Sequence, residues 1–198
     1  MKYLEKIQGL LPLGYLYLIV LGLLKESIMF YQLDINILKY SSLTDILLSP
    51  VADMITNPIL IVMILVMILI FFALQVFVIK NSHKNWAQKL LMSYRINADP
   101  DKRELRKAMI PVFAALVAFE LLSLFVGLGL GGGNRIKKRL ESQNLNYNYR
   151  LTTGSDAPAE IYMIDINSTY YFYVKKGEKQ IRIAPVGGIS NLEVIKKN

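Results

Sequence analysis

The chain has 198 residues, of which 54% are hydrophobic, and it carries a formal net charge of +8. It contains no cysteine and one histidine, which excludes disulfides, thiolate catalysis, and metal sites built from cysteine or several histidines. The apolar residues gather in three blocks, whereas the last third of the chain has an ordinary globular composition. This segregation predicts a membrane part followed by a small domain outside the membrane.

The first apolar block, residues 7–24, predicts an uncleaved membrane helix. Lys2 and Lys6 precede it, as in a signal peptide, but no small-residue cleavage pattern follows the apolar run. Pro12 and the glycines of this block are tolerated more readily in membrane helices than in soluble ones. We expect this crossing to end near Lys25.

The second and third blocks, residues 58–79 and 108–130, are each long enough to cross a bilayer. At 1.5 Å per residue the second block spans about 33 Å, and Gln75 is its only polar side chain. The third block contains one charge, Glu120, and residues 99–101 ahead of it resemble a helix N-cap with a first-turn proline. The glycine run 127–133 follows a membrane helix rather than a strand, so a flexible or tightly packed helix exit is favoured over a phosphate-binding loop.

Residues 43–55 form a predicted interfacial helix between the first two crossings. Ser42 and Asp45 match a capping box, and apolar residues then recur at helical spacing. A fourth crossing here is disfavoured by Asp45, Asp53 and three serines. We expect this helix to lie on or dip into the membrane.

The tail changes to a strand pattern. Residues 160–166, 169–175, 179–184 and 189–195 are short β-branched and aromatic runs separated by turn residues, and 145–151 is a further candidate strand. Alternation places Tyr170 and Phe172 on one face and Tyr171 and Tyr173 on the other, so one face would be core and the other a binding platform or a membrane-facing surface. The predicted fold is an integral membrane α-helical bundle over residues 1–139, with three transmembrane helices and the interfacial helix. A small antiparallel β domain, as an open sheet or an SH3-like barrel, follows over residues 140–198.

Positive charge predicts the orientation of the helices. The basic loop 80–107 and the N-terminus carry ten lysines and arginines, against six on the opposite face, which favours the N-terminus and loop inside and the β domain outside. This orientation requires the basic cluster at 135–139 to be translocated. The candidate residues for binding anionic lipids or a partner are Lys84, Lys89, Arg95, Lys102, Arg103, Arg106, Lys107, Arg135, Lys137, Lys138 and Arg139. Trp86, Leu90 and Tyr94 share a helical face, which favours an interfacial helix over a nucleic-acid reader.

Glu120 is the intramembrane residue that requires an explanation. An ionised carboxylate at mid-membrane costs at least ~2.5 kcal/mol on insertion scales, so it should be protonated or face other helices. Ser123 lies on its face and Tyr15 at a similar depth on the first helix, which allows an interhelical hydrogen bond. An ion or proton site, or a ring of acids in an oligomer, is the functional alternative. Gln75 is interpreted as structural.

Residues 14–27, 34–40 and 42–47, together with the tail patterns 167–174, 181–185 and 189–195, resemble a group of small bacterial membrane proteins. The resemblance implies a multi-pass protein of the bacterial cytoplasmic membrane that ends in a short β domain. Some members of such groups accompany anti-phage systems as membrane sensors or effectors. The resemblance transfers no catalytic residue.

Together these observations predict a non-enzymatic, homo-oligomeric membrane protein without metal or cofactor. Its β domain or basic loop would engage a ligand or protein partner, and the helices would transmit or execute the response. One alternative is a channel or transporter component that uses Glu120. Another is a structural membrane anchor or assembly factor.

Overall fold

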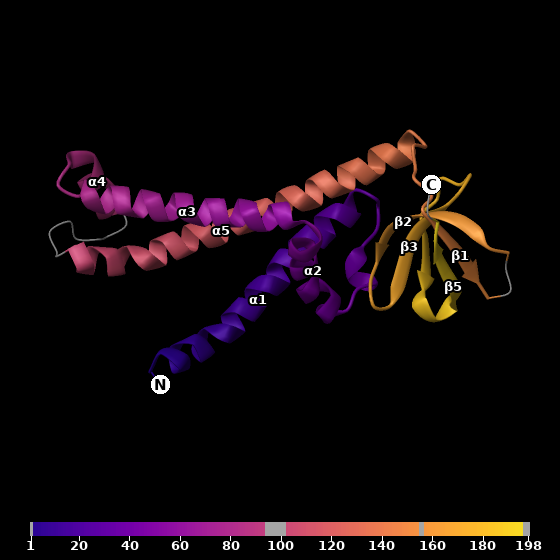
Figure 1. The fold of residues 1–198 in the computed structure, drawn as a ribbon, viewed down its shortest axis with the longest axis horizontal. Helices are drawn as coiled ribbons and strands as arrows, with labels where there is room; N and C mark the ends of the chain where they lie inside the picture. Colours follow the sequence, from indigo (N-terminus) through magenta and orange to yellow (C-terminus); the bar gives the residue numbers. More distant parts are fainter. Residues whose placement is uncertain (1, 94–101, 155–156, 196–198) are drawn as a thin grey trace. The chain divides into compact units, whose positions relative to one another are not determined.

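The computed structural model describes residues 2–93, 102–154 and 157–195 (Figure 1). Its elements in chain order are α1 (Lys2–Tyr31), the 3-10 helix η1 (Ile37–Lys39), α2 (Leu43–Thr56), α3 (Pro58–Lys80), α4 (Asn85–Ser93), α5 (Lys102–Glu141), β1 (Tyr149–Thr153), β2 (Ala159–Ile166), β3 (Tyr170–Lys175), β4 (Arg182–Pro185), the 3-10 helix η2 (Val186–Gly188) and β5 (Ile189–Val194). Contacts divide the chain into a first unit, Met1–Val51 with Phe125–Asn198, and a second unit, Ala52–Leu124. Each unit is described by itself.

Three helices in the described part of the chain are long and apolar enough to cross a membrane. These segments are Gln8–Tyr31 in α1, Pro58–Lys80 in α3 and Arg103–Glu141 in α5. Helix α3 is the most apolar, with a mean hydropathy of 3.2 over its best 18 residues. It is apolar around its whole circumference, as a lipid-facing helix is. The three predicted crossings fall inside these helices, which indicates membrane association.

Helix α5 is much longer than the apolar block that predicted it. It continues through the glycine run to Glu141, so its 40 residues extend over about 60 Å, twice the thickness of a hydrocarbon core. The glycine run is therefore not the helix exit that was predicted, although the tight packing that was the other half of the prediction is present at Gly129 and Gly133. The predicted N-cap at residues 99–101 lies outside the described residues.

Helix α2 begins where the capping box predicted. The Asp45 amide donates to the Ser42 hydroxyl oxygen at 3.1 Å, and the Ser42 amide donates to the Asp45 carboxylate at 2.9 Å. Ile46, Leu47 and Pro50 form its buried face. Asn57 alone separates α2 from α3. Whether α2 lies on a membrane or enters it stays a prediction.

The second unit packs α3 and α4 against the first part of α5. Its core consists of Val78, Ile79, Leu91, Leu105 and Met109. The Trp86 ring of α4 stacks on Phe77 of α3 at 5.7 Å between centroids, so the aromatic residue of the predicted loop helix contacts protein. Tyr94, the third member of that predicted face, lies outside the described residues.

The tail forms a five-stranded antiparallel sheet in the order β4-β3-β2-β1-β5. The meander β1-β2-β3-β4 is joined by β5, which returns to pair with β1 in the register Arg150↔Glu193 and Leu151↔Leu192. The predicted antiparallel sheet is confirmed. Among the described residues β4 and β5 form no ladder with each other, so the sheet is not closed into the predicted barrel.

The sheet curls strongly nevertheless. Four strand spacings of about 4.8 Å would put β4 and β5 about 19 Å apart in a flat sheet, whereas the chain from Pro185 to Ile189 reaches at most about 14 Å. Residues of both edge strands, Ala184 and Leu192, accordingly pack on one small core of Leu151, Ile161 and Tyr173. That core lies on the face of Tyr171 and Tyr173, because curling brings the edge strands over it.

Candidate functional site

The candidate site is the junction where the other face of the sheet packs on the helix ends of the first unit. Phe172 of β3 is fully buried, and its ring centroid lies 4.9 Å from that of Phe30 near the end of α1. The junction core, as we call this cluster, consists of Met29, Phe30, Leu33, Ile37 and Phe172. Ile136 and Leu140 of α5 pack against it from outside. One aromatic side chain of the sheet therefore contacts the same core as the ends of α1 and α5.

A carboxylate joins α2 to the sheet. Asp45 Oδ1 accepts the backbone N–H of Ser168 at 3.1 Å, and Asp45 Oδ2 accepts the hydroxyls of Ser168 at 2.9 Å and Ser42 at 2.6 Å. Partial burial acts to raise the pKa of Asp45, but the hydrogen bonds from Ser42 and Ser168 outweigh it and hold the pKa below its ordinary value. The ionised form is therefore the one that caps α2 and binds the β2–β3 turn.

Asn167, the neighbour of Ser168, fixes the same turn to the segment after η1. Its Nδ2 group donates to the backbone oxygen of Tyr40 at 3.0 Å, while its Oδ1 accepts the amides of Thr169 and Tyr170 at 2.9 and 2.7 Å. The Tyr40 and Tyr170 rings meet edge to face at 5.4 Å. The Asn167 side chain thus both stabilises the β2–β3 turn and fixes it to the segment after η1.

Two glycines of α5 let its backbone approach α1. A Cβ atom on Gly129 would lie 2.6 Å from the backbone oxygen of Lys25, and one on Gly133 would lie 2.6 Å from that of Met29. The two positions are four residues apart, the spacing of small residues at close helix contacts in membranes. The Gln32 side chain donates to the backbone oxygens of Gly129 and Leu130 at 3.3 and 3.2 Å. The glycine run is therefore a packing surface inside a helix.

A buried polar cluster holds α2 on α1. Gly22 gives room for the backbone of Ile46, and one turn later Ser49 donates a hydrogen bond to the Glu26 carboxylate. The Lys25 ammonium donates to Glu26 at 2.9 Å and to Ser49 at 3.2 Å, and Glu26 is only 8% exposed. Burial of a carboxylate requires such partners. Sequence reasoning treated Lys25 and Glu26 only as the end of an apolar run.

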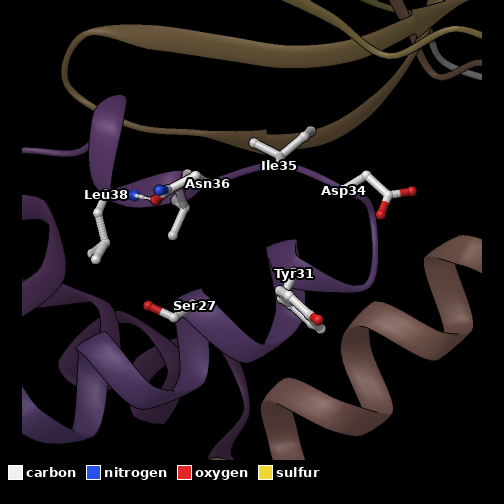
Figure 2. Close-up of a pocket in the computed structure, with 7 residues that line it drawn as sticks. Ser27, Tyr31, Asp34, Ile35, Asn36 and Leu38 are labelled. Atoms are coloured by element: carbon white, nitrogen blue, oxygen red, sulfur yellow. Dashed lines mark hydrogen bonds between the residues drawn. The ribbon is translucent and has the colours of Figure 1, made fainter.

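A cavity of about 470 Å³ opens between α1 and the segment that leads into η1. Ser27 and Tyr31 of α1 form one wall, and residues 34–38 form the other (Figure 2). Asp34 stands at one end of the opening with φ of 60°, a conformation that aspartate and asparagine tolerate better than most residues. Ile35 packs against the junction core from this segment, so the cavity wall and the sheet share a support.

The intramembrane candidates are spread over both units. Glu120 is exposed and lies against an apolar surface of α3 that includes Val66 and Ile70, and it has no hydrogen bond or ion pair within the described residues. The Ser123 hydroxyl donates to the backbone oxygen of Phe119 at 3.1 Å, one turn earlier in its own helix. Tyr15 is 60% exposed and belongs to the first unit, so the Tyr15–Glu120 bond stays a prediction.

Gln75 and the basic candidates line the described helices without forming one site. The Gln75 amide donates to the backbone oxygen of Arg106 at 3.5 Å, which connects α3 with α5 inside the second unit. The basic side chains that stand exposed are Lys84, Lys89, Arg103, Arg106, Lys107, Arg135, Lys137 and Lys138, whereas Arg139 is partly buried. Arg95 and the side chain of Lys102 lie outside the described residues.

Comparisons with known proteins add no assignment. No protein-family model, no curated protein and no solved structure matches the chain. Within the described residues no group of three or more histidine, cysteine, aspartate or glutamate side chains could hold a metal ion. At the junction, the sheet and the C-terminal ends of α1 and α5 pack on one shared apolar core.

Proposed function

We propose that the protein is a non-enzymatic, homo-oligomeric membrane sensor or effector whose β-sheet binds a ligand or protein partner. The single observation that carries the proposal is the burial of Phe172 among residues of α1, with α5 packed against the same core. A tethered anchor domain would need no such core. A sheet that must relay binding to the helices does need one, because packed cores shift between discrete arrangements rather than deforming continuously.

The direction of the helices supports a three-crossing topology. Helices α1 and α5 both bring their C-terminal ends to the sheet, and α3 lies between them in the chain. If all three helices cross, the sheet lies on one side and the basic loop 80–107 with the N-terminus on the other. This is the arrangement that the distribution of lysine and arginine favours in the bacterial cytoplasmic membrane.

A channel or transporter component remains the second candidate, and one observation favours it. Glu120 is exposed on its helix without a partner in the described residues. Acidic residues within membrane helices are rare and commonly mark ion or proton paths. Three helices per chain enclose no path by themselves. A conduction role would therefore depend on the same oligomer that the first proposal invokes.

The experiment that tests the proposal separates the sheet from the helices. The full chain, a chain ending at Gln143 and the Phe172→Ala variant would be expressed in a bacterial host, with Val194→Ala as the control because Val194 is 67% exposed. We expect all four to resist carbonate extraction from membranes. Membrane depolarisation and growth would respond only in the full chain and the control. An identical response from the truncated chain would contradict a sensing role for the sheet.

The resemblance to defence-associated membrane proteins extends the proposal to anti-phage defence. The matching assay is the plating efficiency of a phage panel on cells that carry the full chain or Phe172→Ala. Protection by the full chain, lost in Phe172→Ala and kept in Val194→Ala, is the expected result. Equal plating on all strains would contradict the defence role. The transmission of binding from the sheet to the helices would still be tested by membrane depolarisation.

A further inference from the structure

We infer that the cavity between α1 and residues 34–38 binds the headgroup of a phospholipid that carries a primary amine, such as phosphatidylethanolamine. The inference rests on the proposed membrane placement and names a ligand that the proposed function does not. The depth of the cavity in the membrane supports this inference first. Ser27 and Tyr31 lie about 3 and 9 Å beyond Lys25 along α1, where the apolar block ends, and this interval corresponds to the headgroup layer.

The polar groups of the cavity complement an ammonium and a phosphate. Asp34 is the only charged residue among the seven described residues that line the cavity, so the site favours a cation at that end. Asn36 uses its Oδ1 to accept the amide of Leu38 at 3.2 Å, which leaves its NH₂ group as a donor. The Asn36 amide is a donor of the kind that a phosphodiester accepts.

Ser27 provides an independent sign that a ligand belongs here. Its hydroxyl oxygen is buried and has no hydrogen-bond partner within the described residues. Such a group costs free energy unless a bound water or ligand satisfies it. Figure 2 shows the Ser27 hydroxyl on the side of α1 that faces residues 36–38, between the two walls of the cavity.

The same geometry disfavours other headgroups. An anionic headgroup would meet Asp34, and the described residues of the lining include no lysine, arginine or histidine. A choline headgroup carries a positive charge but no N–H donor, so it cannot make the charge-assisted hydrogen bond that Asp34 offers to a primary amine. The apolar side chains of Ile37 and Leu38 in the lining suit a glycerol backbone and the start of an acyl chain.

Binding at this cavity would bear on the sheet. Ile35 and Ile37 contribute to both the cavity wall and the cluster around Phe172. A headgroup that orders residues 34–38 would therefore steady the surface on which β3 rests. The lipid acts in this account as a structural ligand of the junction.

The test is native mass spectrometry of the full chain, purified in mild detergent, with dioleoyl lipids of ethanolamine, choline or glycerol headgroup added at equal concentration. We expect the ethanolamine lipid to bind at least threefold more than the other two. Asp34→Asn should weaken its binding about tenfold, because asparagine keeps the backbone conformation but loses the charge. Ser27→Ala should weaken it about threefold, while Glu141→Gln, an exposed acid on α5, should change nothing.

Equal binding of the three lipids, or no effect of Asp34→Asn, would overturn the inference. Glycerophosphoethanolamine, which lacks acyl chains, is expected to compete only weakly; strong competition would indicate a site for a soluble phosphoamine and overturn the lipid assignment. If the chain resists carbonate extraction but binds the three lipids equally, only this inference is overturned. If carbonate releases the chain from the membrane, the proposed membrane function is contradicted as well.

Discussion

Asp45 and Ser168 are 123 residues apart in the chain, yet the Asp45 carboxylate accepts both the backbone amide and the hydroxyl of Ser168. The same carboxylate closes the capping box of α2. One side chain therefore determines both where α2 begins and where the β2–β3 turn docks.

Removing one partner of this contact should loosen the sheet. We expect Ser168→Ala to lower the free energy of unfolding by about 1 kcal/mol, the usual net value of a hydrogen bond. Asp45→Ala should cost more, because it also removes the hydrogen bonds that the carboxylate accepts from the Ser42 amide and hydroxyl, each worth about 1 kcal/mol. Thermal unfolding in detergent measures both, with Glu141→Gln as the control. Equal stability of Asp45→Ala and the control would show that the contact contributes nothing.

The contribution of Asp45 should depend on pH in a predictable direction. Its pKa in the folded chain lies below the ordinary value of 3.8, so the stabilisation is complete above that value and is lost as the pH falls through the folded pKa. The difference in Tm between the natural chain and Asp45→Asn should be constant from pH 7 to about 5 and shrink below about pH 4. A difference that widened on acidification would contradict the assigned hydrogen bonds.

The glycines of α5 should divide into two classes. Gly129→Ala and Gly133→Ala place a Cβ within 2.6 Å of α1 backbone oxygens, and we expect each to destabilise the first unit by about 1–3 kcal/mol. Gly131→Ala meets nothing within 4 Å and should stabilise α5, since alanine is the better helix former by about 1 kcal/mol. Thermal unfolding of the three variants under one condition decides this. Similar effects at positions 129 and 131 would rule out the close approach.

Glu120 should act in helix association rather than conduction. Glu120→Gln keeps a hydrogen-bonding group in the membrane and should preserve the oligomer, whereas Glu120→Leu should weaken association severalfold, as interhelical hydrogen bonds are worth about 0.6–2 kcal/mol. Cross-linking in membranes reports the oligomer, and ion flux into liposomes reports conduction. A flux that the natural chain supports and Glu120→Gln abolishes would favour the channel over the relay.

Local patterns in the sequence predicted the local elements well. The apolar block 58–79 became α3, and Ser42 with Asp45 predicted the start of α2, because hydropathy and capping depend on residues close in the chain. Strand runs broken by turn residues likewise predicted the antiparallel sheet. The alternation of side chains along β3 correctly predicted that Tyr170 and Phe172 share one face of the sheet.

What the sequence could not predict depends on distant partners. The glycine run was interpreted as a flexible or tightly packed helix exit because it follows a membrane helix. Its contacts with Lys25 and Met29, which lie far away in the chain, give it a packing role inside the helix instead. Ser168 carries no signal that it binds Asp45. The curl of the sheet follows from the short connection at Val186–Gly188 between strands whose pairing partners lie elsewhere.

The central claim is that the sheet is fixed to the helix ends, and proximity in native membranes tests it most directly. Because the chain has no cysteine, an Asp45→Cys and Ser168→Cys pair would hold its only two thiols. Mild oxidation in membranes should convert most of this double variant to an intramolecular disulfide within minutes, while each single variant forms none. Free thiols in the oxidised double variant, both still reactive with maleimide, would contradict the docked sheet.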